Sequence, residues 1–391
     1  MVATSDDSAA GPAASAVRRA ARVALVVAAA LIVYGSLYPF QFKSSGAAVL
    51  GWPARATTSD VLINFLLYMP IGALGQLAAP AAMSIGRRLA LIVAFATLLS
   101  AGVEVTQAFD AGRHSSRLDV MMNAAGALTG IGFALGLRHA PFWRHLPRET
   151  GVGSALFVLG LWLSWRLSPF LVDFSGATVP AAFADFAAHW WPDRPTLLAF
   201  AIQWLVVMHL IAALGPQRHV LARAALCLAA ISAIRVWMPG RAITAQEVYG
   251  FAIAASLWAV GLRQAWVAAL ALAIQFIDIG LAPAGPWRPR PVNWLPFRSL
   301  IRNASELAMQ ILLGHLFAAG VFVWLLARTG IGYRGAIPIG LGLSIGIEWG
   351  QTGVPGRYPD VTDPVIYVVM ALALARIETL ALPGGRADPR R

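Results

Sequence analysis

Cysteine is almost absent from this 391-residue chain, which contains a single one, Cys227. A lone cysteine excludes an intramolecular disulfide framework and a cysteine-based zinc site. Charged residues are also scarce, at 12% of the chain, whereas soluble domains carry about 25%. No polar stretch is long enough to hold a separate soluble domain. The chain therefore lacks the polar surface that a water-soluble fold requires.

The motifs give no support to nucleotide, nucleic-acid or metal chemistry. The chain contains no Walker A sequence, no dinucleotide-binding fingerprint, no serine nucleophile elbow and no His-x-x-x-His pair. Its net charge of +12 comes from arginines scattered singly or in pairs, and these do not form a basic domain. We therefore expect no cofactor, no bound metal and no nucleic-acid partner. The residues single out no catalytic group.

Long apolar runs fill the chain instead. Hydrophobic residues make up 58% of it and the mean hydropathy is +0.68. Each run is about 17–22 residues long, the length that spans a bilayer as a helix. Twelve spans are predicted, near residues 20–37, 61–79, 87–107, 119–138, 152–170, 196–214, 220–238, 247–262, 264–282, 306–327, 334–351 and 362–379. The predicted fold class is an all-α polytopic membrane protein, with membrane lipid as a partner.

The distribution of basic residues predicts the orientation, because they accumulate on the cytoplasmic side of membrane proteins. With the N-terminus inside, the inner segments hold 17 of the 30 basic residues and 5 of the 18 acidic ones. The whole net charge then lies inside, so both termini are predicted to be cytoplasmic. The loop at 283–305 is the exception, since it puts four arginines outside. It is either an anion-attracting patch or a place where the helix count is wrong, and the sequence leaves both open.

A string of polar residues occurs twice in register, 244 positions apart. The seven identities are Ser100, Gly102, Glu104, Gln107, Gly112, Arg113 and Asp119 in the first copy, and Ser344, Gly346, Glu348, Gln351, Gly356, Arg357 and Asp363 in the second. Each copy begins in one apolar run and ends at the start of the next. The polar residues are therefore predicted at the turn of a helical hairpin, and the orientation puts both turns on the outer face.

Further polar residues are predicted to join the first copy at the same membrane surface. Two pairs, Asp60 with Asn64 and Asp119 with Asn123, are each four residues apart and so share a helix face. The first candidate site is Asp60, Asn64, Glu104, Gln107, Arg113, Arg117, Asp119 and Asn123. Two interpretations stay open: the charges neutralise one another as a structural clasp, or they bind a ligand, as intramembrane ionisable groups often do.

In these residues the chain resembles the VanZ-like membrane proteins. The resemblance covers residues 30–136 closely, and its motifs are Tyr34 to Phe40, Asp60-x-x-x-Asn64 with Pro70-x-Gly72, Glu104-x-x-Gln107, and Arg113-x-x-x-Arg117-x-Asp119-x-x-x-Asn123-x-x-Gly126. It implies a bacterial inner-membrane protein built of four-helix units, linked through the founding member of the family to low-level teicoplanin resistance. It implies no defined reaction.

The rest of the chain resembles the same four-helix unit, repeated and diverged. The predicted units are 20–140, 150–263 and 264–380, with disordered cytoplasmic tails at 1–19 and 381–391. Pro-Phe turns recur at Pro169-Phe170 and Pro296-Phe297, each at or just beyond the outer end of the first helix of a unit. Three units of four helices account for the twelve predicted spans.

The later units keep the polar residues unevenly. The second candidate cluster, in the third unit, is Glu306, Gln310, Glu348, Gln351, Arg357 and Asp363. Tyr367 stands there at the place of Asn123. In the middle unit Arg235 stands near the place of Glu104, so the charge is reversed. We expect the middle unit to have lost the role of its glutamate.

Two function classes follow from these features. The first, which we favour, is a non-catalytic cell-envelope protein whose outer Glu/Arg/Asp cluster binds an anionic or sugar-bearing ligand and affects glycopeptide (teicoplanin) susceptibility. The second is an enzyme or transporter acting on a polyprenyl-phosphate-linked glycan in envelope or exopolysaccharide assembly, with arginines holding phosphate and Glu104 or Glu348 as base. We favour the first because an enzyme would present one deep site, whereas this chain has two similar clusters and a third that has diverged.

Overall fold

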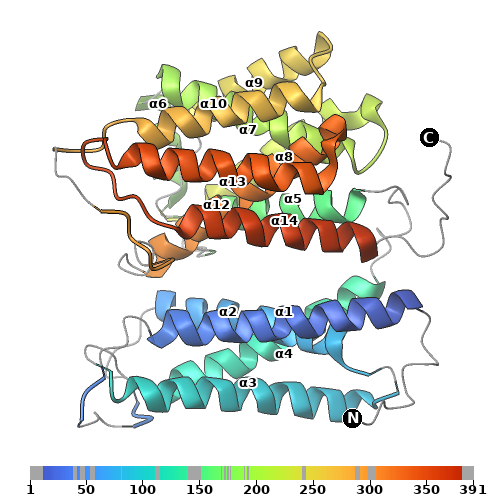
Figure 1. Ribbon diagram of the computed structural model, residues 1–391, viewed down its shortest axis with the longest axis vertical. Helices are drawn as coiled ribbons and strands as arrows, with labels where there is room; N and C mark the ends of the chain where they lie inside the picture. The colour runs from blue at the N-terminus through green and yellow to red at the C-terminus, as the bar shows by residue number, and fades with distance from the viewer. Residues whose placement is uncertain are drawn as a thin grey trace. The chain divides into compact units, whose positions relative to one another are not determined.

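The computed structural model is helical through most of the chain that it describes (Figure 1). The described residues are 12–37, 42–44, 49–52, 58–80, 82–110, 115–139, 151–168, 170, 173, 176, 178–188, 190–191, 193–239, 244–286, 291–297 and 305–380. Within these ranges there is no strand, and three isolated β-bridges connect the loops. Apolar segments favour helices in lipid because a helix satisfies its own backbone hydrogen bonds.

The first of two compact units contains four helices that run side by side (Figure 1). They are α1 (Pro12–Leu37), α2 (Thr58–Ala78), α3 (Ile85–Gln107) and α4 (Arg117–His139). Each corresponds to one of the first four predicted spans. Helix α1 begins at Pro12, so residues 12–19 of the predicted disordered tail are helical, and the rest of that tail lies outside the described residues. Proline suits the first helical position, and the alanine-rich sequence after it favours helix.

Glycines bring α2 and α4 into backbone contact. A Cβ atom at Gly126 of α4 would lie 1.9 Å from the carbonyl oxygen of Phe65, and one at Gly130 would lie 2.0 Å from that of Met69. On α2, a Cβ at Gly72 would lie 1.8 Å from the carbonyl oxygen of Ala127. Small residues at this spacing let membrane helices approach closely. The α2–α4 pair is therefore the tightest contact of the first unit, and any larger residue at these glycines would force the helices apart.

The second compact unit contains the remaining helices. They are α5 (Val152–Leu167), α6 (Thr178–Ala188), α7 (Arg194–Ala212), α8 (Val220–Arg235), α9 (Ala245–Ala259), α10 (Ala265–Leu281), α12 (Ser305–Leu326), α13 (Gly332–Gln351) and α14 (Thr362–Leu380), with a short 3-10 turn, η3 (Gln217–His219), and a π-helical segment, η4 (Ala327–Ile331). All but α6 correspond to predicted spans. The predicted units at 150–263 and 264–380 pack within this single compact unit, so their separation stays a prediction.

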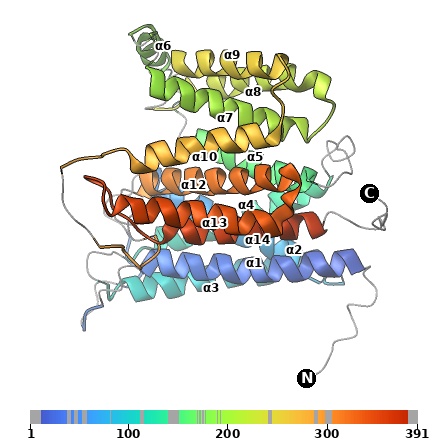
Figure 2. The ribbon, with the colours of Figure 1, turned by 45° about the horizontal axis from the view of Figure 1, so that its top comes forward.

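The extra helix α6 has a different character from the others. It is 11 residues long, which is too short to cross a bilayer. Phe183 is exposed on it, and Trp190 and Trp191 beyond its end are exposed as well. Figure 2 shows α6 near one end of α7 and α9, away from α12 and α14. No span was predicted here, because an apolar run of this length is too short to cross a bilayer.

Five segments of the described chain are long and apolar enough to cross a membrane. They are Asp60–Ala78, Ile85–Gln107, Arg117–Gly136, Arg194–Ala212 and Ala308–Gln351. The last is 44 residues long and contains two predicted spans. Gly330 and Gly332 break it, with φ of 100° and 63°, a left-handed conformation that glycine adopts without steric cost. The chain reverses there between α12 and α13.

A shared core fills the second compact unit. Trp162 of α5, Trp204 of α7 and Leu325 of α12 are fully buried in it, with Phe322 and Tyr367 nearby. Trp162 and Trp204 meet edge to face, with their ring centroids 5.3 Å apart. Helices α5 and α12 pack closely, so the middle and last groups of four helices bury apolar surface against each other. The same pairing, second helix on fourth, recurs as α2 on α4, α7 on α9 and α12 on α14.

Candidate functional site

Glu104 connects two helices at the polar end of the first unit. Its Oε2 accepts a hydrogen bond of 2.7 Å from the backbone N–H of Ser116, the residue before α4. The first N–H groups of a helix have no partner within the helix, and a carboxylate there also complements the helix dipole. Glu104 is only 4% exposed. It therefore caps α4 from α3, and we call this contact a clasp. It joins a carboxylate to a backbone N–H, whereas the structural interpretation of the sequence had charged side chains neutralising one another.

Gln107 connects α3 to the first helix in a similar way. Its Nε2 donates a hydrogen bond of 2.8 Å to the carbonyl oxygen of Ser36, in the last turn of α1. Carbonyl groups at the end of a helix are also left without a partner. The two polar residues at the end of α3 thus satisfy backbone groups at the start of α4 and the end of α1.

A buried hydrogen-bonded network lies one turn deeper. Asn123 of α4 donates from Nδ2 to the Oγ of Ser100 on α3, at 2.7 Å. The hydroxyl of Tyr68 on α2, which is 1% exposed, also bonds Ser100. Three helices therefore meet at one serine hydroxyl. The prediction that Asn123 lies at this end is consistent with its position, whereas Tyr68 and Ser100 were not among the candidate residues, although Tyr68 is four residues after Asn64 and Ser100 belongs to the repeated string.

The exposed part of this end is formed by the other candidate residues. Asp119 at the start of α4 is hydrogen-bonded by the side chains of Ser116 and Asn64, and the carboxylate of Asp60 lies close enough to act on it. Asp60 and Arg117 are exposed. Arg113 lies outside the described residues. We call Asp60, Asn64, Arg117 and Asp119 the rim, and Tyr68, Ser100, Glu104, Gln107 and Asn123 the floor.

The segment after α1 lies across the turn between α3 and α4. The backbone N–H of Lys43 donates to the carbonyl of Phe109 at 2.7 Å, and that of Arg117 donates to the carbonyl of Gly51 at 3.0 Å. The N–H of Leu50 donates to the Oγ of Ser115 at 2.9 Å. These bonds hold the segment beside the start of α4, so it borders the rim.

The second copy of the string makes the same clasp. The Oε2 of Glu348 accepts a hydrogen bond of 2.7 Å from the backbone N–H of Asp360, and both clasps join residues twelve positions apart. The backbone N–H of Asn293 donates to the carbonyl of Pro359 at 2.9 Å, so a loop segment pairs here as well. The two glutamates of the string therefore have the same structural role.

The side chains of Arg357 and Gln351, in the second cluster, face α10. Arg357 donates from Nε to the carbonyl of Ala282 at 2.7 Å and from Nη2 to the carbonyl of Ile279. It satisfies carbonyl groups at the end of α10, which is a common use of arginine near a helix C-terminus. A Cβ added at Gly280 would lie 3.8 Å from the Nε2 of Gln351, so this side chain also faces α10. Gln310 is half-buried on α12, and the side chain of Glu306 lies outside the described residues.

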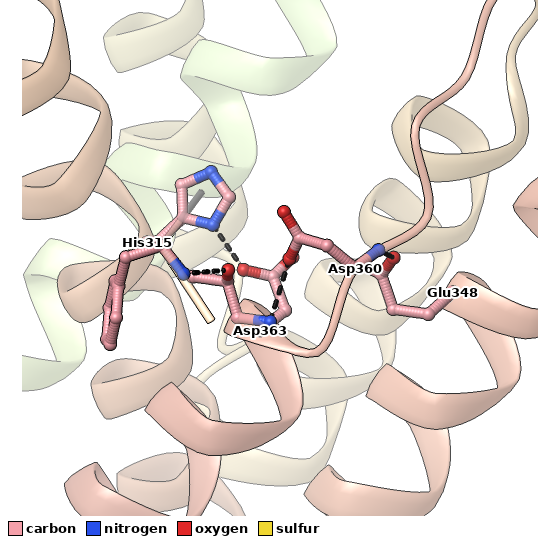
Figure 3. A network of polar contacts seen from close by, with 6 residues as sticks. His315, Glu348, Asp360 and Asp363 are labelled. Carbon is pink, nitrogen blue, oxygen red and sulfur yellow. Dashed lines mark hydrogen bonds and ion pairs between the residues drawn. The ribbon is translucent and has the colours of Figure 1, made fainter. Parts of the chain in front are cut away.

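His315 and Asp360 join the second cluster, and neither was among the predicted site residues. The Nδ1 of His315 on α12 contacts Oδ1 of Asp363 at the start of α14 (Figure 3). Asp360 accepts a hydrogen bond of 2.7 Å from the N–H of Thr362, and its own N–H binds Glu348. Figure 3 shows the imidazole of His315 and the three carboxylates grouped at one end of the helices. The sequence did not point to His315 as a site residue, because it lies inside an apolar run.

The middle group of helices replaces the clasp with buried ion pairs. Glu247 of α9 contacts Arg166 of α5 at 2.5 Å and Arg235 of α8 at 2.8 Å. The Arg235–Glu247 contact also joins residues twelve positions apart, so the predicted charge reversal at the place of Glu104 produces a contact of similar geometry. Glu247 is 2% exposed. This carboxylate therefore connects three helices where Glu104 connects two.

The Pro-Phe turns share an unusual backbone conformation. Phe170 and Phe297 have φ of 65° and 64°, in the left-handed region that bulky residues rarely adopt. Such conformations persist only where the surroundings hold them. At Phe297 the backbone N–H donates to the Oγ1 of Thr362 at 2.8 Å, which attaches this turn to the start of α14. The turn at Pro39-Phe40 lies outside the described residues.

The described residues contain no group of three or more His, Cys, Asp or Glu side chains arranged to hold a metal ion. A family model described as VanZ/LLP1 matches residues 14–138. No curated protein and no solved structure shows a significant match to the chain. The matched segment contains α2 and α3, all but the last residue of α4 and nearly all of α1, and it includes every residue of the rim and the floor. Residues 14–138 therefore form a VanZ-like domain, and its apolar helices indicate a membrane protein of this type.

Proposed function

We propose that this chain is a multi-pass protein of the bacterial inner membrane, with twelve crossing helices in three units and both termini in the cytoplasm. A helix lies at each predicted span, and the inner segments carry the whole net positive charge. The pairing of the second helix with the fourth in each group of four supports a threefold repeat. In this topology the rim lies on the outer face of the membrane.

Cysteine labelling tests the orientation. Ser44, after α1, and Ser84, before α3, are both exposed and lie at opposite ends of the first unit. In a Cys227→Ala background, we expect Ser44→Cys to react with a membrane-impermeant maleimide on intact cells and Ser84→Cys to react only after lysis. The reverse pattern would overturn the proposed orientation, because the two positions are matched in residue type and exposure.

We further propose that the rim binds a sugar-bearing envelope ligand. The observation that carries this proposal is the difference in exposure between floor and rim: the floor side chains are buried, whereas Asp60 and Arg117 are exposed beside Asp119 and Asn64. Carboxylates and amides both accept hydrogen bonds from hydroxyl groups and so orient them. Two carboxylates at the rim favour a hydroxyl-rich ligand over a purely anionic one. A glycopeptide such as teicoplanin, or a lipid-linked cell-wall precursor, has this chemistry.

Variants of the rim and the floor are expected to behave differently. Asp60→Asn and Arg117→Gln remove charge from exposed side chains, so the level of protein in the membrane should be unchanged. Loss of a hydrogen bond to a charged group would weaken ligand binding about tenfold, and teicoplanin susceptibility of cells expressing the variant should revert toward that of cells without the protein. The measurement is the minimum inhibitory concentration, together with the amount of protein in isolated membranes.

Glu104→Ala is the matched comparison for the rim variants. It removes the cap of α4, which costs about 0.5–2 kcal/mol in helices, so level and phenotype should fall together. If the rim variants also lowered protein level in step with phenotype, the whole cluster would be a clasp and the binding proposal would be wrong. If they altered neither, the rim would have no part in susceptibility.

The contacts do not favour the alternative of an enzyme or transporter for a polyprenyl-phosphate-linked glycan. Glu104 and Glu348, the expected bases, each accept a backbone N–H, and Arg357, an expected phosphate ligand, donates to carbonyl groups of α10. Residues already engaged in this way are poorly placed to transfer a proton or hold a phosphate. The non-catalytic proposal therefore accounts better for the described contacts.

A further inference from the structure

The two copies of the string differ directly beneath the clasp. In the first unit, the hydroxyl of Ser100 is bonded by Asn123 and Tyr68. In the last group of helices, Ser344 occupies the same place in the string, and its residue is 3% exposed. The Oγ of Ser344 is buried and has no hydrogen-bond partner among the described residues. The second copy therefore has, at the position matching Ser100, a polar group that no described residue satisfies.

The missing partners explain this difference. Tyr367 stands at the place of Asn123, and Gly314 stands at the place of Tyr68 when Gln310 is aligned with Asn64. The ring of Tyr367 packs on Phe322 and lies close to Gly340, one turn deeper than Ser344. Neither residue supplies the N–H or O–H that the serine has in the first unit. Buried hydroxyl groups are normally paired, because an unpaired one costs free energy.

Above this serine, the cluster carries an excess of negative charge. Ser344 and Glu348 are four apart and both buried on the same face of α13, so the hydroxyl lies one turn below the clasp. The charged side chains that interact electrostatically with Glu348 are those of Asp363, Asp360 and His315. Even without Asp360, the two carboxylates of Glu348 and Asp363 outnumber the single imidazole of His315. The side chains of His315 and Asp363 are 40% and 34% exposed, so the cluster is open to solvent at this level.

We propose that this end of α12, α13 and α14 binds a primary ammonium group, which donates hydrogen bonds to the hydroxyl of Ser344 and to the carboxylate of Glu348. An ammonium has three N–H donors and no acceptor, which matches a site of carboxylates and an unpaired oxygen. It supplies the N–H donor that the amide of Asn123 supplies to the serine in the first unit. The partly exposed side chains of Asp363 and His315 lie near Glu348, and the carboxylate of Asp363 attracts the cation. The proposal is independent of the sugar-binding rim.

Binding of small amines to the purified full-length protein tests this site. In detergent micelles, we expect ethanolamine and glucosamine to bind by isothermal titration calorimetry, and choline to bind at least about tenfold more weakly because it has no N–H to donate. Native mass spectrometry with phosphatidylethanolamine and phosphatidylcholine distinguishes a lipid headgroup from a free amine. Retention of phosphatidylethanolamine alone would identify the lipid as the source, and binding of the free amines would identify a soluble one. Both outcomes support the ammonium site.

Ser344→Ala separates ligand binding from folding. Its hydroxyl has no partner in the described part of the chain, so the melting temperature should not fall, whereas affinity for the amine should drop about tenfold. Ser100→Ala is the matched control, because it removes two hydrogen bonds from the first unit and should leave amine binding unchanged. Equal binding of ethanolamine and choline, or full amine affinity in folded Ser344→Ala and Asp363→Asn variants, would overturn the proposal.

Discussion

Replacing Gly126 with leucine is expected to abolish the packing of α2 against α4 and with it the folded first unit. A Cβ at this position would lie 1.9 Å from the carbonyl oxygen of Phe65, and the obstructing atom belongs to backbone that cannot move to another rotamer. Overpacking of a core commonly costs about 1–3 kcal/mol and more where the backbone must shift. We expect a cost at the upper end or beyond it, and a near-complete loss of protein from the membrane, measured by fluorescence-detected size exclusion.

Gly132 provides the control on the same helix. A Cβ there would meet nothing within 4 Å, so Gly132→Leu adds the same side chain into open space. Its melting temperature should match that of the unmodified protein, or exceed it slightly, because leucine is the better helix former. Equal loss in both variants would show that α4 tolerates leucine at neither position, and backbone contact at Gly126 would then not be the cause.

Replacing Glu247 with leucine is expected to be the most destabilising change in the second compact unit. The carboxylate is 2% exposed and contacts both Arg166 and Arg235, so its removal leaves two guanidinium groups without their common partner in a buried site. Arginine does not lose its proton in proteins. Breaking a buried ion pair from one side costs about 3–5 kcal/mol. The result should be a large fall in melting temperature and in membrane level.

The triple variant Arg166→Met, Arg235→Leu and Glu247→Leu tests the cause. Replacing a whole buried ionic group with apolar residues of similar volume is often neutral or stabilising, so the triple variant should recover most of the lost stability. Arg194→Leu, at an exposed position at the start of α7, should change it by no more than about 0.5 kcal/mol. If the triple variant were no more stable than Glu247→Leu, packing and not charge would explain the loss.

The positions of the long helices could be predicted from the sequence because hydropathy acts over about twenty residues at a time. Each predicted span coincides with a helix to within several residues. The short helix α6 is shorter than the roughly twenty residues over which hydropathy is informative. Its location could not be predicted, since an 11-residue apolar segment is too short to define a span.

The candidate site could be predicted less completely. The string itself identified Glu104 and Gln107, yet their partners are a backbone N–H and a backbone carbonyl, which no side-chain pattern reveals. Tyr68 was overlooked because tyrosine in an apolar helix is ordinarily a packing residue. His315 was overlooked because its partner, Asp363, is 48 residues away on another helix. Long-range contacts between helices depend on packing, which the sequence does not state locally.

The clasp of Glu104 has a consequence for how related chains can vary. Its Oε2 accepts a hydrogen bond from a main-chain N–H, a group that every amino acid except proline supplies. The capped position is serine at 116 and aspartate at 360, while the glutamate is the same in both places. Selection on this contact therefore acts on one member of the pair only. A search for pairs of residues that change together among related sequences would miss this contact. Proline at the capped position would remove the N–H and abolish the hydrogen bond.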